Sequence, residues 1–283
     1  MLMLVEGQSS TERKGRTADR TGSEQANVLL IHGLGSRGSD LSRVADGLSG
    51  NEIVAMPDLR GHGQSPPGPA GQLEDFAVDL LPLIDEHEQL LVGASFGAWV
   101  ALALWRMRPE RVTGVILVDP PLTYGPLFEW ASRGGTHGHP DRQSRERILG
   151  KLTAVYHSRD EHEAVNLMKE HPLTMHLNDA DRASNARSLM AADRPTLLAG
   201  LALVNRPEDQ MRPPNSGVVP VILFGDQSSL TGPERSQLFA EGIGGRTVSY
   251  HGGHVAHFEA PTEVAACIQQ VLGSDESYEI AVR

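Results

Sequence analysis

The chain has 283 residues, of which 39% are hydrophobic, and it carries a formal net charge of −11 at pH 7. This acidic balance argues against nucleic acid or an anionic membrane as a partner, because both bind a basic protein face. The sequence has one cysteine, no apolar run of about 18 residues and no apolar stretch typical of a secretory leader. We therefore expect a cytoplasmic protein without an intrachain disulfide.

The first part of the chain, residues 1–27, is expected to be a flexible leader or a poorly ordered hairpin. Its stretch 6–27 is rich in Ser, Thr, Arg, Glu and Gly and has no apolar periodicity. The apolar run Val28–Ile31 follows, and comparable runs recur at 52–56, 89–92, 114–118, 218–224 and 246–250. Short runs of this kind are typical of strands buried on both faces of a parallel sheet.

Helical patterns stand between several of these runs. Apolar residues recur at helical spacing over 40–48, 73–84, 97–107 and 261–272, with Asp40 as the expected N-cap of the first helix. Strands that alternate with helices predict an α/β fold with a mostly parallel central sheet flanked by helices.

Residues 122–216 interrupt this alternation. They contain helix-like segments without a convincing buried strand, and the proline pairs Pro120-Pro121 and Pro213-Pro214 lie near their borders. We therefore expect a helical cap at 122–216, inserted into a core formed by 28–121 and 217–283.

The motif Gly93-Ala94-Ser95-Phe96-Gly97 joins a predicted strand to a predicted helix. A turn this sharp strains the backbone of the central serine, and the flanking glycines remove side chains that would collide with the neighbouring strand and helix. Such a turn lifts the Ser95 hydroxyl above the edge of the sheet, so Ser95 is the candidate nucleophile. By itself the pattern also fits an ordinary glycine turn.

Two loops that follow earlier strands add to this interpretation. After the first strand, Ile31-His32-Gly33-Leu34-Gly35 can place the Leu34 N–H beside the N–H of Phe96, which would form an oxyanion hole. His32 is expected to brace this loop. The second loop, Asp58–Ser65, is interpreted as structural, with an ion pair between Asp58 and Arg60.

The third motif, Gly253 to Pro261, follows the last predicted strand and supplies a histidine. A histidine on this loop can reach Ser95, take the hydroxyl proton and return it to the leaving group. His254 directly follows a Gly-Gly pair and is the expected base, whereas His257 lies nearer the last helix and is expected to support the loop.

These four motifs, in this order, resemble the α/β-hydrolase fold family in its capped, esterase-like branch, over residues 28–121 and 217–272. The resemblance implies an acid in a Gly-x-x-Asp pattern after the strand at 218–224, but Ser228 stands at that position. Some family members place the acid one strand earlier, where Asp119 ends the run 115–118. Asp119 is therefore the expected acid and Asp226 the alternative, although Asp119 could also merely cap its loop.

The resemblance implies a serine hydrolase that cleaves a carboxylic ester, lactone or thioester through a Ser-His-Asp triad and an acyl-enzyme. A serine at the turn, in place of a carboxylate, argues against dehalogenase and epoxide hydrolase chemistry. The same residues would suit a C–C bond hydrolase, a lyase or a cyclase, and the missing acid at Ser228 leaves room for a non-catalytic binding protein. No metal or cofactor is expected, since His137 and His139 are more typical of a surface pair.

The expected partner is a small-molecule substrate with an apolar group, and the sequence leaves the oligomeric state open. Four residues soon after Asp119 are candidates for the wall of the substrate pocket: Tyr124, Leu127, Phe128 and Trp130. Packing of the cap on the core is the alternative role for these side chains.

Overall fold

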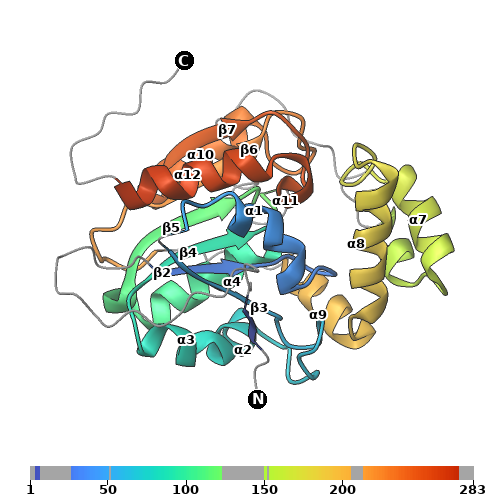
Figure 1. The fold of residues 1–283 in the computed structure, drawn as a ribbon, viewed down its shortest axis with the longest axis horizontal. Helices are drawn as coiled ribbons and strands as arrows, with labels where there is room; N and C mark the ends of the chain where they lie inside the picture. The colour runs from blue at the N-terminus through green and yellow to red at the C-terminus, as the bar shows by residue number, and fades with distance from the viewer. Residues whose placement is uncertain are drawn as a thin grey trace.

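A seven-stranded sheet forms the centre of the computed structural model, which describes residues 4–6, 27–50, 52–122, 150–151, 153–204 and 213–273. The strands are β1 (Leu4–Glu6), β2 (Asn27–Ile31), β3 (Ile53–Pro57), β4 (Gln89–Ala94), β5 (Val112–Val118), β6 (Val221–Gly225) and β7 (Arg246–Tyr250). Their order is β1-β3-β2-β4-β5-β6-β7, and every neighbouring pair except β1–β3 is parallel. The predicted α/β fold with a mostly parallel sheet is confirmed (Figure 1).

Strand β1 lies within the segment expected to be a leader. Residues 4–6 pair antiparallel with β3, at the edge of the sheet, so these three residues are not part of a flexible leader. An apolar run as short as Leu4-Val5 gives little sequence signal for a strand. The remaining residues up to 26 lie outside the described ranges.

The helical elements cover both faces of the sheet and extend beyond one end. Those that belong to the core around the sheet are η1 (Gly38–Leu41), α1 (Ser42–Asp46), α2 (Leu73–Ala77), η2 (Val78–Leu80), α3 (Leu81–Asp85), α4 (Phe96–Met107), η3 (Pro109–Arg111), α10 (Pro233–Ile243), α11 (Ala256–Glu259) and α12 (Pro261–Gly273). Between β5 and β6 come α7 (Glu161–Lys169), α8 (Asp179–Ala191) and α9 (Arg194–Val204).

The first helical turn differs from the prediction. The turn begins at Gly38 with Arg37 as its N-cap, and the Asp40 side chain accepts a hydrogen bond from the Arg37 N–H at 3.2 Å. Asp40 therefore caps from the third helical position instead of the N-cap, because its carboxylate reaches back to an N–H that has no partner within the helix.

Alternate residues of the central strands feed two separate apolar clusters. Leu29 and Ile31 pack on one side with the large side chains of α2 and α4, among them Phe76 and Trp99. Val28 and Leu30 pack on the other side with α1 and α12. This two-sided burial is why the strands are continuously apolar, and it holds their carboxyl ends rigidly in place.

Helices α7, α8 and α9 lie beyond the ends of the strands in Figure 1, with α7 packed on the outer side of α8. They share an apolar cluster of their own, which includes Tyr156, Met168, Leu189, Leu197 and Leu201. We call residues 153–204 the helical segment. Within the described ranges, none of the helices combines the length and the apolar character needed to span a membrane.

Candidate active site

The turn between β4 and α4 has the conformation that its glycines predict. Ser95 has φ 52° and ψ −120°, and its N–H donates to the carbonyl of Val118 at 2.8 Å. A Cβ on Gly93 would lie 2.2 Å from the carbonyl oxygen of Gly97, and one on Gly97 would lie 2.3 Å from that of Ile31. Only glycine fits at these two positions, and the Ser95 side chain consequently stands above the strand ends.

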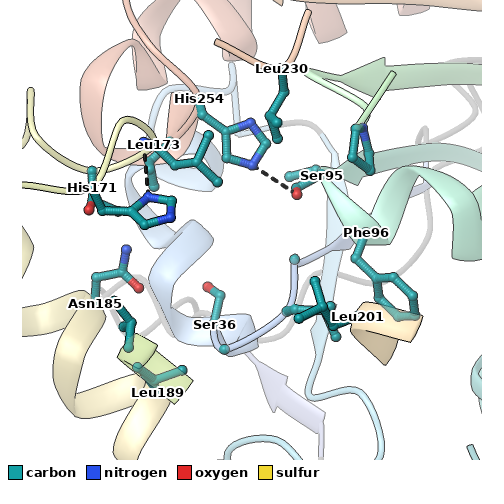
Figure 2. Close-up of a pocket in the computed structure, with 18 of the residues that line it drawn as sticks. Ser36, Ser95, Phe96, His171, Leu173, Asn185, Leu189, Leu201, Leu230 and His254 are labelled. Atoms are coloured by element: carbon teal, nitrogen blue, oxygen red, sulfur yellow. Dashed lines mark hydrogen bonds between the residues drawn. The ribbon is translucent and has the colours of Figure 1, made fainter. Parts of the chain in front are cut away.

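His254 lies between the Ser95 hydroxyl and the Asp119 carboxylate. Its Nε2 is 2.9 Å from Ser95 Oγ, the contact drawn as a dashed line in Figure 2, and its Nδ1 is 2.5 Å from Asp119 Oδ2. Since Asp119 can only accept at this contact when ionised, Nδ1 carries the ring proton and Nε2 accepts from the serine. The imidazole is therefore oriented for proton transfer from Ser95.

Asp119 follows β5 in a strained backbone conformation. Its φ is 43°, and within the described ranges only Ser95 shares a positive φ among non-glycine residues. The Asp119 N–H donates to the carbonyl of Leu223 at 2.7 Å, which ties this conformation to β6. Strain at a non-glycine residue costs on the order of 1–3 kcal/mol and clusters at functional sites, so its presence at both residues singles them out.

The alternative acid, Asp226, lies against a different histidine. Its carboxylate bonds His251 Nδ1 at 2.9 Å and accepts the Gly252 N–H at 3.1 Å. The hydrogen bond from His251 lowers the pKa of Asp226, and the same contact raises the pKa of His251. The structure thus brings Asp119 to His254 and leaves Asp226 in an exposed pair.

Two residues that the sequence analysis did not single out hold the loop of His254. Glu259 accepts the N–H of Gly253 at 2.7 Å and that of Val255 at 3.0 Å, one on each side of His254. The Tyr250 hydroxyl donates to the carbonyl of Gly253 at 2.6 Å. Glu259 stands five residues after His254, at the end of α11. This position was the sequence signal for a residue that could bond the loop of His254.

The loop after β2 passes directly beside the nucleophile. A Cβ on Gly33 would lie 3.1 Å from the Cβ of Ser95, which places the next residue, Leu34, at the same end of the sheet. His32 fixes this loop, because its ring bonds the Gly33 carbonyl at 2.8 Å and accepts the Leu59 N–H at 2.9 Å. Burial lowers the pKa of His32, which suits a neutral bracing role.

The predicted ion pair between Asp58 and Arg60 is wrong. Asp58 is buried and accepts the N–H groups of Gly38 at 2.7 Å and Gln64 at 2.8 Å, whereas Arg60 pairs with Asp79 at 2.8 Å. Residues two apart on an irregular loop point in different directions, so Asp58 turns inward to backbone donors and Arg60 turns out to α2–η2. The loop is structural, as expected.

A cavity opens in front of Ser95 and His254. It encloses about 960 Å³ of empty space, counting its open mouth, and most of its exposed wall is apolar. Apolar side chains from several elements line it: Val155, Met168, Leu173, Leu189, Leu201, Val204 and Leu230. Figure 2 shows polar groups of Ser36, His171 and Asn185 on the wall across from the nucleophile.

The predicted pocket residues Tyr124, Leu127, Phe128 and Trp130 lie outside the described residues. Most of the apolar lining comes instead from the helical segment, whose sequence carries no pattern that separates a cavity wall from a packing surface. His257 also lines the cavity; burial lowers its pKa to about 4, and it is His254 that contacts Ser95. Among the described residues, no cluster of three or more His, Cys, Asp or Glu side chains could hold a metal ion.

A mostly parallel sheet with a serine at a strand-to-helix turn is the architecture of an alpha/beta hydrolase. The profile of the Alpha/beta hydrolase family matches residues 28–267. The chain therefore belongs to the alpha/beta hydrolase family.

Two curated relatives resemble part of the chain. It is 38% identical to "Lipase LipV" of Mycobacterium tuberculosis over 99 residues, which cover 34% of the chain and 37% of that protein. It is 27% identical to "Esterase YbfF" of Escherichia coli over 101 residues, which cover 34% of the chain and 40% of that protein. The matches thus span well under half the length of either relative.

Solved structures resemble the chain over most of its length. A bromoperoxidase from Bacillus anthracis gives a TM-score of 0.71 at 18% identity, covering 89% of this chain and 93% of that one. A hydrolase from Oleispira antarctica gives 0.70 at 19% identity, covering 90% and 93%. At these identities the likeness shows the shared fold.

Proposed function

We propose that this chain hydrolyses carboxylic esters, lactones or thioesters through an acyl-enzyme on Ser95. The observation that carries the proposal is the unbroken line of hydrogen bonds from Ser95 Oγ through the His254 ring to the Asp119 carboxylate. Membership of the alpha/beta hydrolase family and the names of the lipase and esterase relatives support this class of reaction.

The reaction begins when Ser95 Oγ attacks the substrate carbonyl and its proton passes to His254 Nε2. Asp119 stabilises the resulting imidazolium and holds the ring in place. The N–H groups of Leu34 and Phe96 receive the carbonyl oxygen as it becomes negative; that of Phe96 is the first of α4, where a helix leaves its amides unpaired. His254 then protonates the departing alcohol or thiol.

The second half of the reaction releases the acid. A water molecule enters the place of the leaving group and gives a proton to His254 while its oxygen attacks the acyl carbon. Collapse of this intermediate breaks the bond to Ser95 Oγ, which takes its proton back from His254. The products are a carboxylic acid and the free enzyme.

The apolar cavity indicates an apolar acyl or alcohol group in the substrate. Its leucine-rich wall comes largely from the helical segment, which we take to act as the cap over the site. Each buried CH₂ contributes about 0.8 kcal/mol, so kcat/KM for p-nitrophenyl esters should rise with acyl length until the cavity is filled.

The test combines ester turnover with labelling by a fluorophosphonate, which reacts with an activated serine. We expect rapid labelling at Ser95, turnover of at least one p-nitrophenyl ester, and a fall in kcat of about 10⁶-fold in Ser95→Ala with an unchanged melting temperature. Turnover retained in Ser95→Ala would refute the proposal. Labelled Ser95 without any ester turnover would instead indicate C–C cleavage, lyase or cyclase chemistry on the same residues.

A non-catalytic binding role is the alternative suggested by Ser228 at the usual place of the acid. The contact between His254 Nδ1 and Asp119 Oδ2 supports the catalytic role instead. Absence of labelling at Ser95 in a folded protein would favour the binding role.

A further inference from the structure

Among the described residues, the Asp119 carboxylate has three hydrogen-bond donors besides His254, one at the end of β6 and two in the loop between β6 and α10. The Gly225 N–H donates to Oδ1 at 3.2 Å, and the Thr231 hydroxyl donates to the same oxygen. The Ser228 hydroxyl donates to Oδ2 at 2.6 Å. Asp119 is fully buried, so this loop replaces the water that an ionised carboxylate would otherwise require.

We propose that Ser228 and Thr231 are positioning residues for the proposed triad. They hold the Asp119 carboxylate against His254, and Ser228 occupies a place from which a carboxylate could itself reach the histidine. This inference rests on the proposed function, and it assigns a purpose to the residue that departs from the Gly-x-x-Asp pattern.

The orientation of the Ser228 hydroxyl is fixed by its surroundings. Its Oγ accepts the Leu230 N–H at 3.2 Å, so its own proton is directed to Asp119 Oδ2. The Ser228 N–H donates to the Gly225 carbonyl at 3.1 Å, which closes the loop in a tight turn. The donor is thus set in place by backbone contacts before any substrate binds, which is what precise alignment of a triad requires.

Thr231 secures the other carboxylate oxygen. It is buried and bonds Oδ1, which also receives the Gly225 N–H, while Oδ2 receives Ser228 and His254. With both oxygens held, the carboxylate cannot rotate about its χ2 angle, and Oδ2 stays aimed at His254 Nδ1. Loss of either hydroxyl should therefore misalign the histidine without touching the substrate.

The geometry also indicates how a carboxylate could reach His254 from the end of either β5 or β6. Ser228 Oγ and His254 Nδ1 both lie within 2.6 Å of the same oxygen, Asp119 Oδ2. An aspartate at 228 is one bond longer than serine in that direction, so its carboxylate would reach the histidine from β6. An asparagine at 119 would then remain as a neutral neighbour.

The first experiment measures the rate of fluorophosphonate labelling of Ser95, together with kcat and KM for a p-nitrophenyl ester. We expect Ser228→Ala and Thr231→Val each to slow labelling and to lower kcat by about tenfold, since a hydrogen bond to a charged group contributes about 1.5 kcal/mol, with KM within about twofold. Thr231→Ser keeps the hydroxyl and should restore the rate. Ser229→Ala is the matched control, because the Ser229 hydroxyl is buried without a partner among the described residues.

The second experiment moves the acid. Asp119→Asn should lower kcat by about 10⁴-fold, and adding Ser228→Asp to it should recover at least tenfold in kcat and in labelling rate. Thermal unfolding of each variant shows whether it is folded. Unchanged labelling in Ser228→Ala and Thr231→Val, or a folded double variant no faster than Asp119→Asn, would overturn the inference. A wild-type protein that is not labelled at all would overturn the proposed function instead.

Discussion

The carboxyl ends of the strands and the helical segment contribute to the same cavity in different ways. Residues at the strand ends are fixed by backbone contacts: Ser95 and Asp119 have positive φ angles, and the N–H of each donates to a carbonyl of the neighbouring strand, β5 for Ser95 and β6 for Asp119. The helical segment meets the core through side chains, such as Leu34 against Gly200 and Ser188 against Asp40, and through one backbone bond from the Asp193 N–H to the Gly61 carbonyl. The strand ends carry the groups placed for reaction, and the helical segment supplies most of the apolar cavity wall.

The largest expected effect separates two of the histidines that line the cavity, His254 and His171. His254→Ala should lower kcat on a p-nitrophenyl ester by about 10⁵-fold, because it removes the imidazole whose Nε2 lies 2.9 Å from Ser95 Oγ. His171, in the helical segment, accepts the Leu173 N–H at 3.1 Å through Nδ1. His171→Asn preserves an acceptor there and should change KM severalfold while kcat stays within about tenfold.

Steady-state kinetics on both variants decides this prediction. A kcat loss in His171→Asn as large as that in His254→Ala would mean that the helical segment supplies a reacting group. The contrast between the two regions would then fail at its main point.

The next effect contrasts two closely packed glycines. Gly97 lies against the backbone of β2, and Gly200 of the helical segment lies against the Leu34 side chain of the core. Alanine at Gly97 would place its Cβ 2.3 Å from the Ile31 carbonyl oxygen, which belongs to the sheet and cannot move aside. Alanine at Gly200 in α9 would meet the Leu34 Cδ2 at 2.5 Å, which is the end of a flexible side chain. We expect Gly97→Ala to destabilise the fold by about 3 kcal/mol or more.

For Gly200→Ala the expected loss is below about 1 kcal/mol, since the better helix propensity of alanine offsets the shift of Leu34. Urea unfolding of both variants measures the difference. Equal losses would show that the helical segment is held as rigidly as the turn.

Much of the arrangement at the carboxyl ends of the strands could be predicted from the sequence, because its features are local. The apolar runs predicted the strands, and the glycines around Ser95 predicted the strained turn. The order of motifs then pointed to His254 and to Asp119 as one of two acids. The strands and the turn needed only residues within a few positions of each other, whereas the acid was implied by the resemblance to a known family.

The long-range contacts around the site were beyond such reasoning. Thr231 meets Asp119 across 112 positions, and Ser188 meets Asp40 across 148, so no local spacing predicts either pair. The wrong pairing of Asp58 with Arg60 has the same origin, because nearness in sequence does not tell which way a loop side chain points. The cavity wall depends on how helices pack, which periodicity alone leaves open.

A pH-dependent effect tests the loop Asp58–Ser65, which contacts the helical segment through the bond from the Asp193 N–H to the Gly61 carbonyl. His62 lies in the loop after β3 and is fully buried, and burial lowers its pKa to about 3. Its ring donates a hydrogen bond to the Arg60 carbonyl. Below the unfolded-state pKa of 6.5 the unfolded chain binds a proton that the folded chain refuses. Stability is therefore lost as the pH falls, by up to about 1.4 kcal/mol per pH unit for this histidine.

Between pH 6.5 and 5 the His62 contribution should amount to about 1.6 kcal/mol. His62→Asn removes the titrating group and retains a donor for the Arg60 carbonyl, so its unfolding free energy should fall less steeply over this range. Urea unfolding at several pH values measures both slopes. Parallel slopes in the two proteins would contradict the burial argument.

The smallest effects compare two polar contacts between the helical segment and the core. Ser188 Oγ donates to Asp40 Oδ1 at 3.0 Å, and both residues are buried. Arg43 bonds Asp181 at 2.7 Å, but half of the Arg43 side chain is exposed, so solvent screens the pair. Ser188→Ala should cost about 1.5 kcal/mol, and Arg43→Ala about 0.5 kcal/mol.

Salt distinguishes the two contacts further. At 1 M salt the screening length falls to about 3 Å, so the cost of Arg43→Ala should largely vanish while that of Ser188→Ala persists. Asp40 keeps the Ser36 hydroxyl at 2.8 Å and the Arg37 N–H in the Ser188 variant, which limits the loss to one hydrogen bond. If Arg43→Ala proved the costlier change, and stayed so in salt, the helical segment would be anchored by surface charge instead of by its buried polar contact with η1.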